Sequence, residues 1–97
     1  MTDRHRALQQ ATVQAVLHGP GTTAPELRQA VARADGPEDL RALLAKVRTE
    51  AATVTDEDWA PLRAKYSEDE LFELVVAGVV GTAERRLDAA LAALEGA

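Results

Sequence analysis

The sequence predicts an all-α fold, a small bundle of five helices with one long helix at its C-terminal end. Ala, Leu, Glu and Arg dominate the composition, and strand-forming residues never alternate with polar ones over a useful length. Apolar stripes with helical spacing are separated by capping residues, glycines and prolines that begin or end helices. We expect a single domain, 1–97, with two short helices in 1–36 and a three-helix region in 37–97.

The composition excludes several classes of function. The chain has no cysteine, which rules out thiolate metal sites, iron–sulfur clusters and cysteine nucleophiles. The net charge is −5 and no basic patch is visible, so we expect no nucleic-acid partner. The longest apolar run, Leu74 to Gly81, is far shorter than the ~20 residues that span a bilayer. The sequence has no signal-peptide pattern, which indicates a cytoplasmic protein, and we expect no membrane partner. The two histidines have no well-placed partner and aromatic residues are rare, so we expect no metal and no cofactor.

The two N-terminal helices are bounded by residues that typically begin or end helices. The first is expected to run from residue 2 or 3 to His18, because Gly19 can take the left-handed cap and Pro20 cannot continue a helix. The second is expected to begin at Thr23, because Thr23-Ala24-Pro25-Glu26 has the pattern of a capping box with proline in the first turn. The turn residues Asp35-Gly36-Pro37 end it.

The next two helices differ in how well their patterns are formed. The third starts near Pro37 and has a single apolar face with i, i+3, i+4, i+7 spacing, made of Leu40, Leu43, Leu44 and Val47. The fourth is capped by Thr55 and has an acidic first turn, 56–58, which suits the helix dipole. Pro61 lies past that turn, so we expect a kink or a short helix that ends near Lys65.

The fifth helix, from Ser67 to about Leu94, holds most of the large apolar residues. Ser67-Glu68-Asp69-Glu70 forms a second capping box at its start. Its first half, 71–81, is nearly apolar all round and has weak helix propensity, so tertiary packing must hold it. Gly78 and Gly81 share one face, where another helix can approach closely. Room for a ligand against the backbone is the alternative interpretation.

The length of this helix predicts self-association. About 28 residues make a rod of roughly 42 Å, whereas a compact domain of this size is about 33 Å across. The overhanging end carries an apolar stripe of Leu87, Ala90, Leu91 and Leu94. Either the first two helices cover this stripe or another subunit does, and we therefore predict a homo-oligomer.

Three segments carry a resemblance to a known family. They are Val54-Thr55-Asp56-Glu57-Asp58, the stretch from Tyr66 to Val75, and Arg86-Leu87-Asp88-Ala89-Ala90-Leu91. From about Pro37 onward the chain resembles the C-terminal half of the alkylhydroperoxidase D (AhpD)-like / carboxymuconolactone decarboxylase superfamily. There a "V-T-D-E-D" helix precedes an "S-D-E-E-I-x-E-L" helix that ends in "R-L-x-x-A-L". The resemblance implies an all-α fold whose long helices pack between subunits, often as trimers or hexamers.

The resemblance does not carry the family's chemistry with it. Its peroxidases use a C-x-x-C-x-x-x-H helix in the half that precedes the matching region, and this chain has short helices there and no cysteine. Its lactone decarboxylases rely on a histidine in the core region. His5 and His18, the only histidines here, both precede the match. No catalytic residue of the family can be placed on this sequence, and Pro61 also departs from its pattern.

A few residues are candidates for a site. Glu73 is a carboxylate within the most apolar stretch, where it either reaches water, pairs with an arginine, or has a raised pKa and acts as an acid or base. Arg86 lies ~20 Å away on the same helix, so the two can meet only across an interface. Phe72, Val76 and Gly78 are candidates for contact with a ligand.

The leading hypothesis is a non-catalytic, shortened relative of this superfamily. It would act as an oligomeric helical module that binds a partner protein or a small apolar ligand. One alternative is a cysteine-independent enzyme in which Glu73, with Arg86 of a neighbouring subunit, performs acid/base chemistry. Another is an accessory subunit of a larger enzyme.

Overall fold

The structure is a computed structural model that describes residues 3–96, and in this range it holds five α-helices and no strand. The all-α fold with one long C-terminal helix is therefore confirmed. The elements are α1 Asp3–His18, α2 Pro25–Ala32, α3 Glu38–Glu50, a short 3-10 turn η1 Ala51–Thr53, α4 Asp56–Arg63 and α5 Glu68–Gly96.

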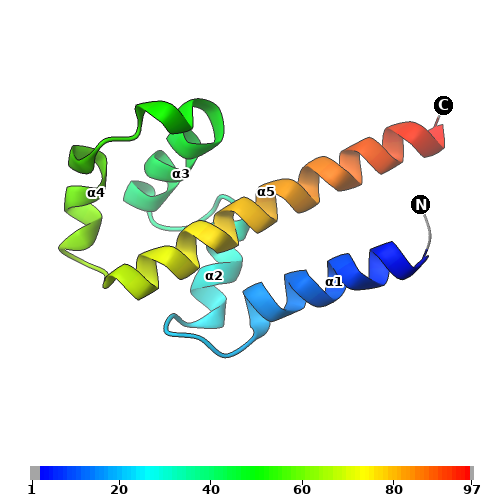
Figure 1. Cartoon of the computed structure of the whole chain (residues 1–97), viewed down its shortest axis with the longest axis horizontal. Helices are drawn as coiled ribbons and strands as arrows, with labels where there is room; N and C mark the ends of the chain where they lie inside the picture. Colours follow the sequence, from blue (N-terminus) through cyan, green and yellow to red (C-terminus); the bar gives the residue numbers. More distant parts are fainter. Residues whose placement is uncertain (1–2, 97) are drawn as a thin grey trace.

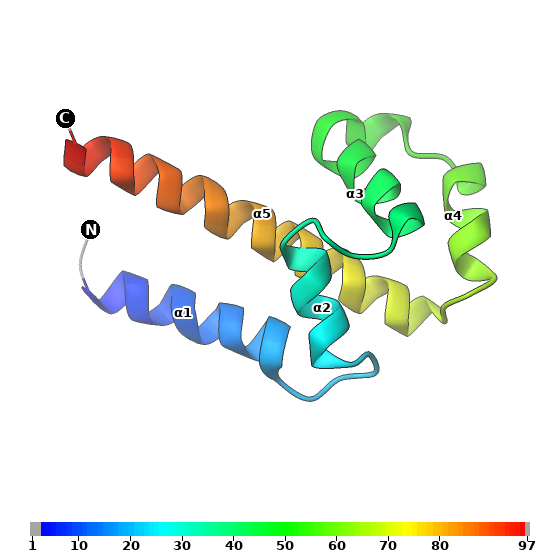
Figure 2. The same ribbon diagram turned by 180° about the vertical axis from the view of Figure 1, so that it is seen from behind.

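The helices form a thin, elongated molecule. α1 and α5 run antiparallel and side by side, while α2, α3 and α4 gather against the N-terminal half of α5 (Figure 1). The reverse view in Figure 2 shows the far ends of α1 and α5 extending together beyond α2. The molecule measures 45 × 30 × 19 Å, so α5 spans its full length. A thickness of 19 Å corresponds to two layers of helices, each about 10 Å across.

The hydrophobic core lies at one end of this long shape. Leu40, Leu62 and Leu74 are fully buried, and Leu71 and Ala77 of α5 join them. The buried residues of α5 end at Thr82. From Ala83 to Gly96 the helix is half-buried or exposed throughout, so its C-terminal half contributes little to the core.

Two glycines allow α5 to approach its neighbours closely. A Cβ atom on Gly81 would meet backbone atoms of Ala32 in α2, its Cα at 2.7 Å among them. A Cβ on Gly78 would lie 3.0 Å from a methyl group of Leu44 in α3. The interpretation of this glycine face as a close helix contact is confirmed, and α5 continues through both glycines as one helix. Arg85 strengthens the same contact, because its guanidinium donates to the carbonyl of Ala32.

The structure confirms two of the predicted helix starts. The amide of Ser67 donates to the Glu70 carboxylate at 2.8 Å, and the amide of Glu70 donates to the Ser67 hydroxyl at 3.1 Å. The amide of Thr55 donates to the Asp58 carboxylate at 2.8 Å. Both of these pairs join a cap residue to the residue three positions later, as in a capping box.

Three predicted turn features are wrong. α2 begins at Pro25 with Ala24 as the N-cap, and Thr23 does not cap it. Gly19 does not adopt the left-handed conformation, since no described glycine has a positive φ. The left-handed residue is Ala34, with φ 60°, which ends α2 before the expected turn. The amides of Ala34 and Asp35 donate to Val31 and Ala30, which is the hydrogen-bond pattern of a Schellman motif.

Candidate functional site

Glu73 receives hydrogen bonds from the loop between α1 and α2. The amides of Thr22 and Thr23 donate to its carboxylate at 2.5 and 3.0 Å, and the Thr23 hydroxyl donates to it at 2.8 Å. Thr23 is buried, and it uses its hydroxyl here rather than to cap α2. Gly21 lies so close that a Cβ there would meet the Glu73 carboxylate at 2.7 Å. A residue of the fifth helix therefore anchors a loop some fifty positions earlier in the chain.

Arg28 completes this cluster from the other side. Its side chain is only 3% exposed, and its guanidinium donates to the carbonyls of Val16 and Gly19 at 2.5 Å each. These carbonyls belong to the end of α1, which a helix leaves without internal partners. The Nε atom of Arg28 has no hydrogen-bond partner among the described residues and lies 3.9 Å from a Glu73 oxygen. We call Thr22, Thr23, Arg28 and Glu73 the loop clamp.

The loop clamp determines the protonation of Glu73. The amides of Thr23 and Thr22 and the Thr23 hydroxyl stabilise the carboxylate and lower the pKa of Glu73 from 4.5 to about 2. The acid/base hypothesis needs a pKa raised towards neutral, and this shift has the opposite direction. A carboxylate that is ionised and already accepts three hydrogen bonds is a structural group, because it has little capacity to exchange protons at neutral pH.

Replacing Glu73 with glutamine should reduce the loss of stability in acid. Because the native pKa lies below the ordinary value of 4.5, ionised Glu73 stabilises the fold above pH 4.5, and this contribution is lost as the pH falls towards 2. In the wild type the midpoint of urea denaturation should fall over this window. Glu73→Gln should start from a lower midpoint at pH 7 and change less on acidification. Equal falls in both proteins would contradict the assignment.

Arg86 is not part of the loop clamp. It is exposed, and it makes no hydrogen bond or ion pair with any residue that the structure describes. Glu73 faces Arg28 of the same chain instead. Glu73 and Arg86 do not meet within one chain, as their separation along the helix predicts, and a pair across an interface stays a prediction.

The three ligand-contact candidates lie on two sides of α5. Phe72 is 72% exposed and lines a shallow groove of about 190 Å³ with Val76, between α5 and the end of α1. Gly78 is buried on the opposite side of the helix against Leu44. The structure brings Phe72 and Val76 together but separates both from Gly78.

Apolar residues that face away from the core run along α5. We call this set the α5 face, and it consists of Phe72, Val76, Val79, Ala83, Leu87, Ala90 and Leu94. Phe72, Val79 and Leu94 are 72%, 49% and 69% exposed, and Val76 and Leu87 are half-buried. Leu8 on the neighbouring α1 is 61% exposed as well. Single exposed apolar residues are ordinary, but a row along a whole helix indicates an interaction surface.

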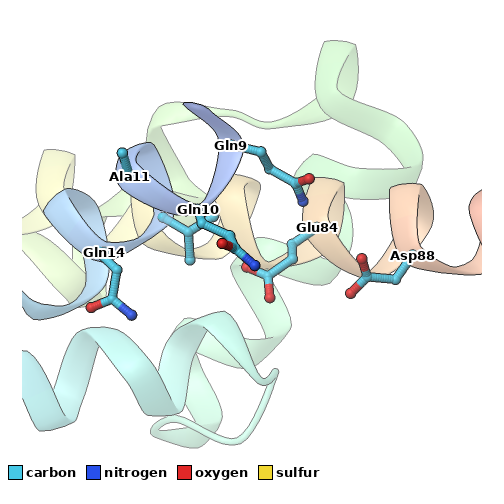
Figure 3. A pocket seen from close by; sticks show the side chains of 7 residues that line it. Gln9, Gln10, Ala11, Gln14, Glu84 and Asp88 are labelled. Atoms are coloured by element: carbon cyan, nitrogen blue, oxygen red, sulfur yellow. The ribbon is translucent and has the colours of Figure 1, made fainter. Parts of the chain in front are cut away.

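A polar cleft of about 580 Å³ separates α1 from α5 on another side. Gln10 and Glu84 reach towards one another across it from opposite helices, and Asp88 lies one turn further along α5 (Figure 3). Glutamine amides and two carboxylates give this cleft a polar lining, and no basic side chain of residues 7–96 lines it. Among the side chains of residues 7–96 there is no group of three His, Asp or Glu able to hold a metal ion.

Sequence reasoning missed Thr22, Thr23 and Arg28 as members of a common cluster. Arg28 did leave a signal, because it lies three residues before Val31 and so shares the apolar side of α2. A charged residue on a buried stripe requires polar partners. Which partners it finds depends on the packing of α1 and α5 around α2, and the sequence pattern does not contain this information.

Comparison of the chain with protein-family models, curated protein sequences and solved structures found no match. None of the helices in the described range is long and apolar enough to cross a membrane. The function must therefore be argued from the loop clamp, the polar cleft and the α5 face. Of these three, the α5 face presents a row of exposed apolar side chains, which are stabilised when a partner buries them.

Proposed function

We propose that this protein is a non-catalytic, oligomeric helical module that works by binding other proteins through the α5 face. It is a shortened relative of the carboxymuconolactone decarboxylase-like proteins that resembles only their C-terminal half. The observation that carries the proposal is the row of exposed and half-buried apolar residues from Phe72 to Leu94. The groove beside Phe72 and Val76 also offers a place for a small apolar ligand.

The amount of exposed surface supports this proposal. The chain exposes 6400 Å², whereas a compact monomer of its mass exposes about 5,400 Å². The radius of gyration is 14.7 Å, against about 12.5 Å for a compact chain of this length. The additional surface is about 1,000 Å², close to the ~800 Å² that each partner contributes to a standard protein interface.

The low burial at the end of the molecule formed by α1 and α5 also supports the proposed binding function. Beyond Thr82, none of the described residues of α5 is buried. A pair of helices with so little buried apolar surface gains little from packing, because helices in proteins are held mainly by burial of an apolar face. A partner that covers the α5 face would bury this apolar surface and so stabilise the two helices.

The enzymatic alternative has less support. It needs Glu73 as a proton donor or acceptor, and the loop clamp already occupies its carboxylate and lowers its pKa to about 2. A role as an accessory subunit of a larger enzyme is compatible with a protein-binding surface. We treat such an enzyme as one kind of partner for the same face.

Val79→Glu tests the proposal. Val79 lies midway along the exposed row, and a carboxylate there would have to be desolvated in any interface that covers it. We expect wild-type protein to show a mass above 10.4 kDa by light scattering at tens to hundreds of micromolar, and Val79→Glu to show the monomer mass. Ala42→Glu is the matched control, because Ala42 is exposed on α3 away from this face.

A wild type that stays at 10.4 kDa at every concentration would contradict the proposed self-association. So would an assembly that Val79→Glu and Ala42→Glu leave equally intact. Circular dichroism of both variants checks that the helical fold is retained. A fold lost only in Val79→Glu would count against the proposal as well, because the residue would then belong to the core.

A further inference from the structure

One line of α5 has the spacing of a coiled-coil seam. Starting in the first turn, residues recur at intervals of three and four along one side of the helix: Asp69, Phe72, Val76, Val79, Ala83, Arg86 and Ala90. We call this line the α5 seam. Such spacing keeps a row of side chains facing one partner helix. The seam has an apolar middle and one charge near each end, negative at Asp69 and positive at Arg86.

The members of the seam are available to a partner. All are exposed except Val76, which is half-buried. Asp69 and Arg86 make no hydrogen bond or ion pair with other residues in the described range, although three other ion pairs are formed there. The two charges therefore have no electrostatic partner within the described part of their own chain.

We propose that two copies of this chain pair through the α5 seam with their helices antiparallel. The two-fold axis passes between Val76 and Val79. In this register Val76 packs on Val79 of the second copy, Phe72 packs on Ala83, and Asp69 faces Arg86. Each contact occurs twice by symmetry. The proposal rests on the proposed oligomeric function, and it specifies the partner and the geometry.

The surface beside Ala83 has room for the Phe72 side chain that packs there in this register. Ala83 lines an apolar pocket of about 260 Å³ with Val80 and Leu87 of α5 and with Thr12 and Val13 of α1. Phe72 is the largest exposed apolar side chain of the face and is 72% exposed in the single chain. A large residue opposite a small one over a pocket is the knob-into-hole arrangement of packed helices.

The alternative arrangements are less favourable. A parallel pair would place Asp69 against Asp69 and Arg86 against Arg86, which opposes like charges. An antiparallel pair shifted by one heptad would place Arg86 against Val76 and desolvate a charge without a partner. A second copy also fits better than an anionic lipid surface, because the chain has a net charge of −5 and its α5 seam carries a single basic residue, Arg86.

Charge reversal tests the register. Asp69→Arg should raise the dimer dissociation constant about tenfold, since it replaces two attractive contacts with repulsive ones. Arg86→Asp should have a similar effect. The double variant Asp69→Arg, Arg86→Asp should return to within about threefold of the wild type, because the swapped charges attract again. Asp88→Arg makes the same change of net charge off the seam and should leave the constant within about threefold.

The orientation has an independent test. The chain has no cysteine, so Ala92→Cys introduces a single position for a spin label on the exposed end of α5. In the antiparallel dimer the two labels should lie about 45 Å apart. A parallel pair would hold them within about 10–20 Å. Sedimentation equilibrium gives the dissociation constants, and pulsed electron-spin resonance gives the distance.

The outcomes separate the two proposals. A wild type that remains monomeric at all concentrations overturns both. An assembly that Val79→Glu disrupts, but in which the double charge swap does not recover, overturns the antiparallel register and leaves the oligomeric module standing. A distance of about 10–20 Å between the two spin labels would also overturn the antiparallel register and leave the oligomeric module standing. Binding to anionic vesicles without self-association would show that a lipid surface, and not a second copy, covers the α5 face.

Discussion

Replacing Arg28 with methionine should lower the free energy of unfolding by about 3–5 kcal/mol, the largest effect that we expect from a single substitution in this protein. The side chain is 3% exposed, and its guanidinium satisfies the carbonyls of Val16 and Gly19. Methionine fills a similar volume but leaves both carbonyls without a donor. It also leaves the carboxylate of Glu73 without the nearby positive charge.

Two further variants give this prediction its control. Arg28→Lys keeps the charge but loses the planar fork that reaches two carbonyls at once, so it should fall between the wild type and Arg28→Met. Arg33→Met removes an exposed arginine next to the same helix and should change stability by less than about 0.5 kcal/mol. Urea denaturation at one fixed protein concentration compares all four proteins, since self-association makes stability depend on concentration. Equal effects of Arg28→Met and Arg33→Met would contradict the role of the loop clamp.

Gly81→Ala should lower the free energy of unfolding by about 1–2 kcal/mol, although alanine is the better helix former by about 1 kcal/mol. The new methyl group would meet backbone atoms of Ala32, which cannot rotate away. α2 must therefore move off α5, and the hydrogen bond from Arg85 to the Ala32 carbonyl would be disturbed with it.

The same helix contains the controls for this second prediction. A Cβ on Gly96 meets nothing within 4 Å, so Gly96→Ala should be neutral or slightly stabilising. A Cβ on Gly78 meets only the flexible end of Leu44, so Gly78→Ala should cost less than Gly81→Ala. If thermal or urea denaturation gave the three variants the same stability, the close contact of α2 with α5 at Gly81 would be refuted.

The helices and most of their ends were predictable because the signals are local. Ser67 and Thr55 begin their helices through bonds to residues three positions away, and such bonds need no information from the rest of the fold. The apolar face of α3 was predicted for the same reason. Leu40, Leu43 and Leu44 are buried as their spacing requires.

The errors occur where a distant element competes for the same group. Thr23 has the right sequence for a helix cap, but its amide and its hydroxyl both donate to Glu73 of α5, and α2 begins two residues later with Ala24 as its N-cap. Gly36 and Gly19 were the expected turn glycines, yet Ala34 takes the left-handed conformation at the end of α2. Strain of this kind persists only where the surrounding structure compensates for it.

By itself the sequence determined the all-α class, the long C-terminal helix and the absence of cysteine chemistry, because composition, helical periodicity and capping are properties of short segments. Only the tertiary structure decided that Glu73 anchors a loop, that Arg28 is its charged neighbour, and which side of α5 stays uncovered. These facts depend on how α1 and α2 lie across α5. That arrangement is fixed by the close contact at Gly81 and by the buried cluster around Leu74, whose members come from across the chain.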